Sequence, residues 1–146
     1  MTIYLKNLQL LKKTLFAKLN DDATLLSLLG ASDRITHKNP PTEPIYPCLV
    51  YYIYNDKDNV YNENISDGDI TTTDIRINIF TNNSVSEIAD NIESRIKKLL
   101  HGQRTLDSNK IICYSCYRDN LSEPIKDPNL QVWVTTVKYK VTWANR

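Results

Sequence analysis

Hydrophobic residues recur at three- and four-residue steps in two segments near the start of the chain, and this spacing predicts two helices. In residues 4–20 the apolar face consists of Leu5, Leu8, Leu11, Leu15 and Leu19. Residues 23–29 form a second, shorter helix. Asp22 stands where a carboxylate can accept the free amide hydrogens of its first turn, and Gly30 stands where a left-handed residue ends it.

A third helix is predicted over residues 84–101. Ser84 and Glu87 have the spacing of a capping box, in which each side chain bonds the backbone amide of the other. The apolar stripe that follows is Val85, Ile88, Ala89, Ile92, Ile96, Leu99 and Leu100. Gly102 is placed to end this helix.

Four segments have the two-residue period of strands: residues 48–55, 70–81, 111–118 and 131–143. The first is apolar or aromatic on both faces, with Cys48, Val50, Tyr52 and Tyr54 on one and Leu49, Tyr51 and Ile53 on the other. The second places Thr71, Thr73, Ile75, Ile77 and Ile79 on one face and polar residues on the other. The last places Trp133, Val137, Tyr139, Val141 and Trp143 together. We therefore expect the first strand to be covered by helix on one side and by a partner on the other.

The predicted element order is α-α-β-β-α-β-β in a chain of 146 residues, which is the size of one domain. Two hairpins separated by a helix predict an α+β fold, with a four-stranded antiparallel sheet and helices packed on one face. A proline-rich stretch with Pro40, Pro41, Pro44 and Pro47 leads into the first strand and disfavours helix there.

Composition excludes several classes of function. The chain has 18 basic and 17 acidic residues, a net charge of +1, whereas nucleic-acid-binding domains usually carry a strong basic excess. Three glycines cannot form the common phosphate-binding loops, and two histidines exclude a histidine-rich metal site. No apolar run approaches the roughly 20 residues of a membrane span. We expect no catalytic residues, no metal and no cofactor.

Three cysteines in a chain without a signal peptide indicate free thiols in a reducing cytoplasm. Cys113 and Cys116 form a CxxC motif on a predicted strand. Because residues three apart on a strand face opposite sides, we expect the two thiols to diverge and to be ordinary buried cysteines.

At this point the layout resembles that of the tail-terminator, or tail-completion, proteins of long-tailed bacteriophages and their prophages. The resemblance extends from about Leu8 to Trp143. It is carried by six runs: DATLLSLLG at 22–30, DRI at 33–35, IYPCLVY at 45–51, DIRINIF at 74–80, EIADNI at 87–92 and VKYKV at 137–141. The most telling feature is the order of short helix, glycine, Arg-Ile and Tyr-Pro strand.

The resemblance implies a structural virion protein that caps the tail tube, ends its elongation and forms a ring, typically a hexamer, to which the DNA-filled head attaches. The implied partners are other copies of the chain, the tail tube protein and a head-completion or connector protein, with DNA only passing through the lumen and no membrane. The protein would be made in the host cytoplasm and reside at the head–tail joint. Two other readings stay open: a head-completion or connector protein of similar architecture, and a cellular protein-binding module or unrecognised enzyme.

Two sets of residues are candidates for assembly surfaces. Residues 55–69 have a net charge of −4, from one lysine and five acids: Asp56, Asp58, Glu63, Asp67 and Asp69. We expect this segment to face the lumen or the tube protein and to order on assembly, because an acidic lumen does not adhere to DNA phosphates. Arg118 and Asp119 are expected to contribute to the subunit interface.

Overall fold

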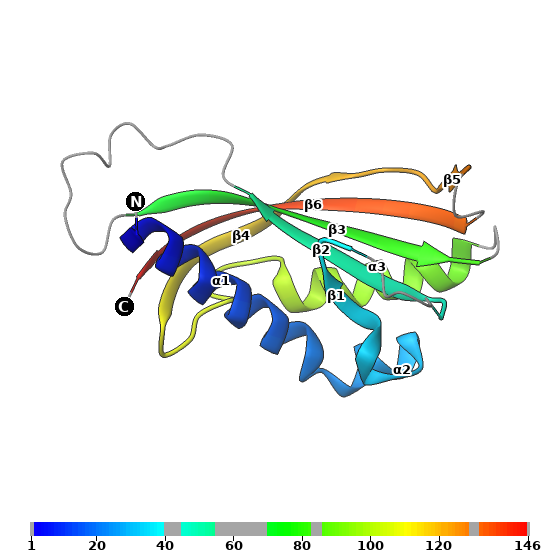
Figure 1. Ribbon diagram of the computed structural model, residues 1–146, viewed down its shortest axis with the longest axis horizontal. Coiled ribbons are helices and arrows are strands. Elements are labelled where there is room, and N and C mark those ends of the chain that lie inside the picture. Colours follow the sequence, from blue (N-terminus) through cyan, green and yellow to red (C-terminus); the bar gives the residue numbers. More distant parts are fainter. Residues whose placement is uncertain (1, 40–44, 55–69, 83–85, 129–131, 146) are drawn as a thin grey trace.

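The computed structural model describes residues 2–39, 45–54, 70–82, 86–128 and 132–145 (Figure 1). Within them lie three α-helices, one short 3-10 helix and six strands. In chain order these are α1 (Thr2–Asn20), α2 (Ala23–Leu29), η1 (Ser32–Arg34), β1 (Ile35–His37), β2 (Cys48–Tyr54), β3 (Thr71–Thr81), α3 (Ser86–Leu100), β4 (Ile111–Leu121), β5 (Ile125–Asp127) and β6 (Val132–Asn145).

The strands form one sheet in the order β1-β2-β3-β6-β4, and β5 pairs with β6 next to the end of β4. All pairs are antiparallel except β1 with β2, which is parallel. The fold is thus mixed α+β, as predicted, but the sheet is not a four-stranded antiparallel one. β1 and β5 were missed because three residues each are too short to show a two-residue period.

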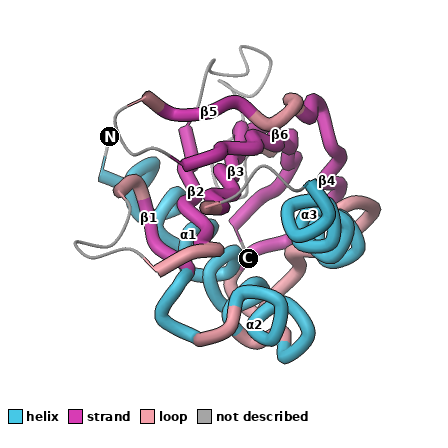
Figure 2. Tube along the Cα trace, turned by 90° about the vertical axis from the view of Figure 1, so that its right-hand side faces the viewer, coloured by secondary structure: helices cyan, strands magenta, loops and turns pink. Residues whose placement is uncertain are grey.

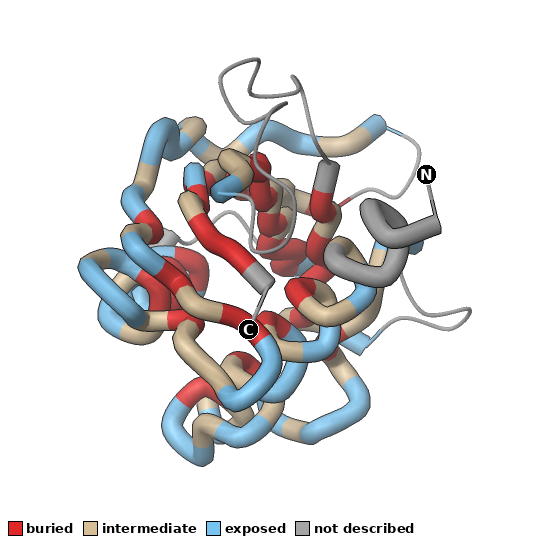
Figure 3. The backbone as a smooth tube through the Cα atoms, turned by 90° about the vertical axis from the view of Figure 1, so that its left-hand side faces the viewer, coloured by how far each residue is buried: buried red, intermediate tan, exposed pale blue. Residues whose placement is uncertain are grey.

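The three helices pack on one face of the sheet and bury one continuous core (Figure 2). The sheet contributes Leu49, Tyr51, Ile53, Ile75, Ile77, Ile79, Val137, Tyr139, Val141 and Trp143. The helices contribute Leu11, Leu15, Leu19, Leu25, Leu29, Ala89, Ile92, Ile96 and Leu100. These are the faces that the sequence pattern predicts, except that Ile88 of the predicted α3 stripe is 38% exposed, and the buried positions gather along the sheet and on the sides of the helices toward it (Figure 3).

The opposite face of the sheet carries a second, smaller apolar cluster. Cys48 and Val50 of β2 pack with Phe80 and Val132, and Tyr46, Tyr52 and Val134 lie around them. Cys48 and Val50 are fully buried although no helix covers this side. The first part of the strand is therefore buried on both faces, by the helices on one side and by neighbouring apolar residues of the same chain on the other, and cover by a partner stays a prediction.

A bidentate ion pair between Asp22 and Arg95 connects α2 to α3. The Asp22 carboxylate accepts hydrogen bonds from Arg95 Nε at 2.8 Å and from Arg95 Nη2 at 2.6 Å. The same carboxylate accepts the Leu25 amide at 2.8 Å, so it also caps the N-terminus of α2, as predicted. These hydrogen bonds hold the pKa of Asp22 below its ordinary value, with the Arg95 side chain as the main cause.

The other end of α2 is closed by Gly30 and Arg34. Gly30 has φ of +95°, and a Cβ atom there would lie 2.7 Å from Arg34 Nη1. The Arg34 guanidinium donates a hydrogen bond to the Leu29 carbonyl, where a cation also favours the negative end of the helix. Position 30 thus favours glycine for its left-handed backbone, whereas the end of the flexible Arg34 side chain could move aside for a Cβ atom. The predicted cap of α3 at Ser84 lies outside the described residues, and α3 ends at Leu100.

We predict that Asp22→Ala lowers the free energy of unfolding by about 1–2 kcal/mol at neutral pH, because α2 loses its cap and its link to α3. The pKa of Asp22 is depressed in the folded state, so this stability is present above pH 4 and declines as pH falls through the lowered pKa. Denaturant unfolding of the wild type and the variant from pH 7 to pH 2 measures the difference. Asp22→Asn, which keeps a capping oxygen, should lose less. A difference that stays constant with pH would contradict this account.

Candidate functional site

The predicted assembly residues fall into two groups. Asp56, Asp58, Glu63, Asp67 and Asp69 lie outside the described residues, so their position at the lumen or tube protein stays a prediction. Arg118 and Asp119 lie on β4, where they differ in exposure. Asp119 is exposed at a break in the β4–β6 register between Arg118 and Asn120.

Arg118 is engaged within its own subunit. Its Nη1 donates to Glu93 Oε1 of α3 at 2.5 Å, and only 28% of the Arg118 side chain and 11% of the Glu93 side chain are exposed. Tyr139 is fully buried, and this burial is the main reason that the pKa of its hydroxyl is raised. The Glu93 charge is the second reason. Arg118 therefore compensates a buried carboxylate and holds α3 to β4, which the sequence did not reveal.

The outer edge of β4 is closed by residues 101–107. Gly102 and Cys116 exchange two backbone hydrogen bonds, of 2.7 and 2.8 Å. On one side of this pair the Asp107 carboxylate accepts the Cys113 amide at 2.9 Å, and on the other His101 Nδ1 accepts the Arg118 amide at 3.0 Å. An open edge strand is a template for pairing with another chain. Here the middle of β4 offers no such template.

The prediction that the Cys113 and Cys116 thiols diverge is wrong. The β4–β6 register shifts between Cys113 and Ser115, so one extra residue is inserted and both cysteines face the helices. Both are free, as is Cys48, and all three are buried, as expected. Burial raises the pKa of Cys113, and it raises the pKa of Cys116 to about 12 and that of Cys48 to about 11. Such thiols stay protonated and are poor nucleophiles.

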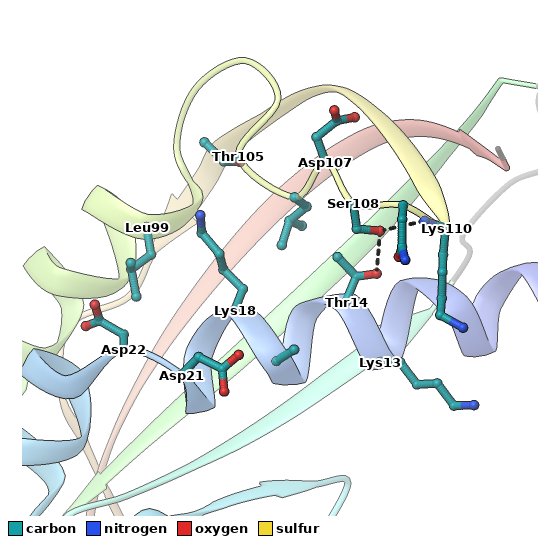
Figure 4. Close-up of a pocket in the computed structure, with 13 residues that line it drawn as sticks. Lys13, Thr14, Lys18, Asp21, Asp22, Leu99, Thr105, Asp107, Ser108 and Lys110 are labelled. Carbon is teal, nitrogen blue, oxygen red and sulfur yellow. Dashed lines mark hydrogen bonds between the residues drawn. The ribbon is translucent and has the colours of Figure 1, made fainter.

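A groove of about 570 Å³ lies between α1, the end of α3 and the turn before β4 (Figure 4). Its apolar surface comes from Ala17 and Leu99. Thr14 and Ser108 join its two sides with a hydrogen bond of 3.3 Å between their hydroxyls, and Ser108 Oγ also accepts the Lys110 and Ile111 amides. The turn that forms one wall is therefore fixed by its own hydrogen bonds. We call this feature the lysine groove.

Three lysines line the lysine groove: Lys13 and Lys18 from α1 and Lys110 from the turn. Lys18 extends from α1 toward Leu99 and Thr105, and Lys110 lies at the opposite end (Figure 4). In the sequence, Lys6, Lys12, Lys13 and Lys18 lie mostly off the apolar face of the first helix, which is typical of an ordinary solvated surface. A sequence signal of a positive surface is that the first 20 residues contain no acid. Only the fold, however, brings Lys110 to the same groove as the lysines of the first helix.

Within the described ranges no group of three or more His, Cys, Asp or Glu side chains is placed to hold a metal ion. No helix in that part of the chain is long and apolar enough to cross a membrane.

No model of a protein family matches the chain, and no curated protein matches it in sequence. The fold is similar to that of a chain in a solved structure described as the virion of a native gene transfer agent particle. The TM-score is 0.65 and the two sequences are 12% identical, with 90% of this chain and 91% of that chain covered. The likeness therefore extends over nearly the whole of both chains, and at this identity it establishes a shared fold.

We predict that Asp107→Ala destabilises the protein by about 1–3 kcal/mol, because the Cys113 amide loses its acceptor at a closed edge. The opened edge should also promote self-association, seen as increased light scattering near the unfolding midpoint. Asp107→Asn keeps an acceptor oxygen and is the control. Equal stability and scattering for the alanine and asparagine variants would contradict the proposed role of Asp107.

The Arg118–Glu93 pair also changes how the predicted interface must be tested. Arg118→Glu places two carboxylates together and should cost about 2 kcal/mol or more in the isolated subunit. Asp119→Lys should alter subunit stability by no more than about 0.5 kcal/mol, because Asp119 is exposed. Denaturant unfolding separates the two effects, and only Asp119→Lys then reports on assembly. An Arg118→Glu variant as stable as the wild type would show that the pair is not structural.

Proposed function

We propose that this chain is a structural, non-catalytic virion protein that caps the tail tube of a long-tailed phage or phage-like particle. In this role it ends tube elongation and forms a ring, most simply a hexamer, to which the DNA-filled head attaches. Its partners are other copies of itself, the tail tube protein and a head-completion or connector protein. Its place is the head–tail joint.

The observation that carries the proposal is the similarity to a gene transfer agent virion chain over 90% of this chain and 91% of that one. A likeness that spans both chains end to end is what two proteins built for related positions in a particle would have. The resemblance of the sequence to tail terminators supports the same class of role, from short runs on α2, β2, β3, α3 and β6.

The chemistry of the described residues supports a non-catalytic role. The three thiols have raised pKa values in apolar surroundings, the reverse of what an activated cysteine needs. The Glu93 carboxylate forms an ion pair with Arg118, and the Asp22 carboxylate forms an ion pair with Arg95. These charged groups fasten helices to the sheet and to one another.

The closed middle of β4 favours a particular mode of ring assembly. A ring needs one surface of each subunit to meet a different surface of the next. Because the outer edge of β4 is bonded to residues 101–107, the subunits do not join by extending their sheets through this segment. Helix faces, grooves, connecting segments and the other sheet edges, such as that of β1, remain as candidate contact surfaces.

Disruption of the gene in the phage or prophage that encodes the chain tests the function. We expect electron micrographs of lysates to show filled heads beside abnormally long, unjoined tails, and a copy of the gene supplied in trans should restore joined particles. Tails of normal length that remain unjoined would assign the chain to the second candidate, a head-completion or connector role. Intact infectious particles would contradict both.

A further inference from the structure

We infer that the lysine groove is a docking site for an acidic segment of a second copy of this chain, residues 55–69. This rests on the proposed function in one respect: a ring brings two copies into head-to-tail contact. The groove itself is a feature of the single subunit.

Within the described residues, Lys13, Lys18 and Lys110 form no ion pair, whereas Arg95, Arg104, Arg118 and Lys140 each do. Lys18 acts on the Asp22 carboxylate as a minor cause of its lowered pKa, without an ion pair, so a carboxylate from outside can approach all three ammonium groups.

The carboxylates that line the same groove are mostly engaged elsewhere. Asp22 is bonded by Arg95 and by the Leu25 amide. The Asp107 carboxylate accepts a hydrogen bond from the Cys113 amide, and its Oδ2 atom lies 3.7 Å from Arg104 Nη1. The lining has three lysines and three aspartates, and Arg95 and Arg104, which pair with Asp22 and Asp107 from outside the lining, give the region a positive excess.

The size of the groove suits a short extended peptide. One wall runs along α1 from Lys13 to Lys18 and on to Asp21, just after the end of the helix, which is eight steps along the chain or about 12 Å at the helical rise. About four extended residues cover that length. The exposed Ala17 and the partly buried Leu99 give the groove apolar surface, which favours a hydrophobic side chain between the charges.

The chain contains a segment with this chemistry. Residues 55–69 carry a net charge of −4 while the whole chain has +1, so the remainder of the chain is basic by five charges. Glu63 and Asp67 are four residues apart, with Ile65 between them. A groove on one copy and a segment on the next are different surfaces, and contacts of that kind close into rings. The neighbouring subunit then takes the place of the lumen or tube protein as the expected partner of this segment.

A peptide assay tests the inference. The probe is an acetylated, amidated peptide of residues 60–70, titrated against the full-length protein. A second receptor has its own segment neutralised as Asp56→Asn, Asp58→Asn, Glu63→Gln, Asp67→Asn and Asp69→Asn. We expect Lys13→Gln/Lys18→Gln/Lys110→Gln to weaken binding at least about tenfold, since three charge pairs are lost. High salt should weaken binding likewise.

The matched control is Lys97→Gln/Lys98→Gln/Lys126→Gln, which removes the same charge away from the groove and should bind as the wild type does. Circular dichroism checks that each variant is folded. Equal affinity for the groove and control variants, or no binding to either receptor, would overturn the inference. So would binding restricted to the neutralised receptor in a protein that stays monomeric, since the segment would then occupy its own groove.

Particle assembly identifies the partner. If the groove variant blocks joining while neutralising residues 55–69 does not, the occupant belongs to another protein and the inference is overturned. The peptide assay is independent of tail length. Its failure therefore leaves the proposed function standing, and normal tails after gene disruption would leave peptide binding unaffected.

Discussion

β3 and β6 pair without a break from Thr71 to Thr81, and this register decides which side chains face the helices. Because strand side chains alternate, the pairing puts Ile75, Ile77 and Ile79 beside Tyr139, Val137 and Thr135 on the same face. A slip of one residue would turn that row outward and leave the helices nothing apolar to cover. β2, β4 and β5 are then added to this central pair, and the helices dock on the face it defines.

The sequence predicted what depends on periodicity and missed what depends on single insertions or distant contacts. The three helices, the cap at Asp22, the stop at Gly30 and the inward faces of β2, β3 and β6 follow from spacing alone. The bulge after Cys113 does not, because an extra residue in one strand is visible only against its partner. The parallel pairing of the three-residue β1 depends on β2, which is remote in sequence. Likewise, nothing near Arg118 in the chain points to Glu93.

The same limits apply to the surfaces. In the sequence Arg118 is a candidate for contact with another subunit, but in the fold it pairs with the buried Glu93 carboxylate. The lysines of α1 fit an ordinary solvated surface in the sequence. Folding brings Lys110 to the same groove as Lys13 and Lys18. It also gives the Asp22 and Asp107 carboxylates other hydrogen-bond partners, so the region of the groove is positive. The edge of β4 is closed by a backbone pair, a carboxylate and an imidazole. Together these features close the middle of β4 to strand pairing and place three lysines at one groove.

The central claim is that this chain forms a ring at the upper end of a tail tube. The most direct test is a cryo-electron microscopy reconstruction of intact particles from the strain that encodes it. The account predicts density for several copies of this α+β domain arranged around the axis between the tube and the head, with DNA or an open channel at the centre. Density for the domain only in the capsid shell or the distal tip, or none in the particle, would contradict it.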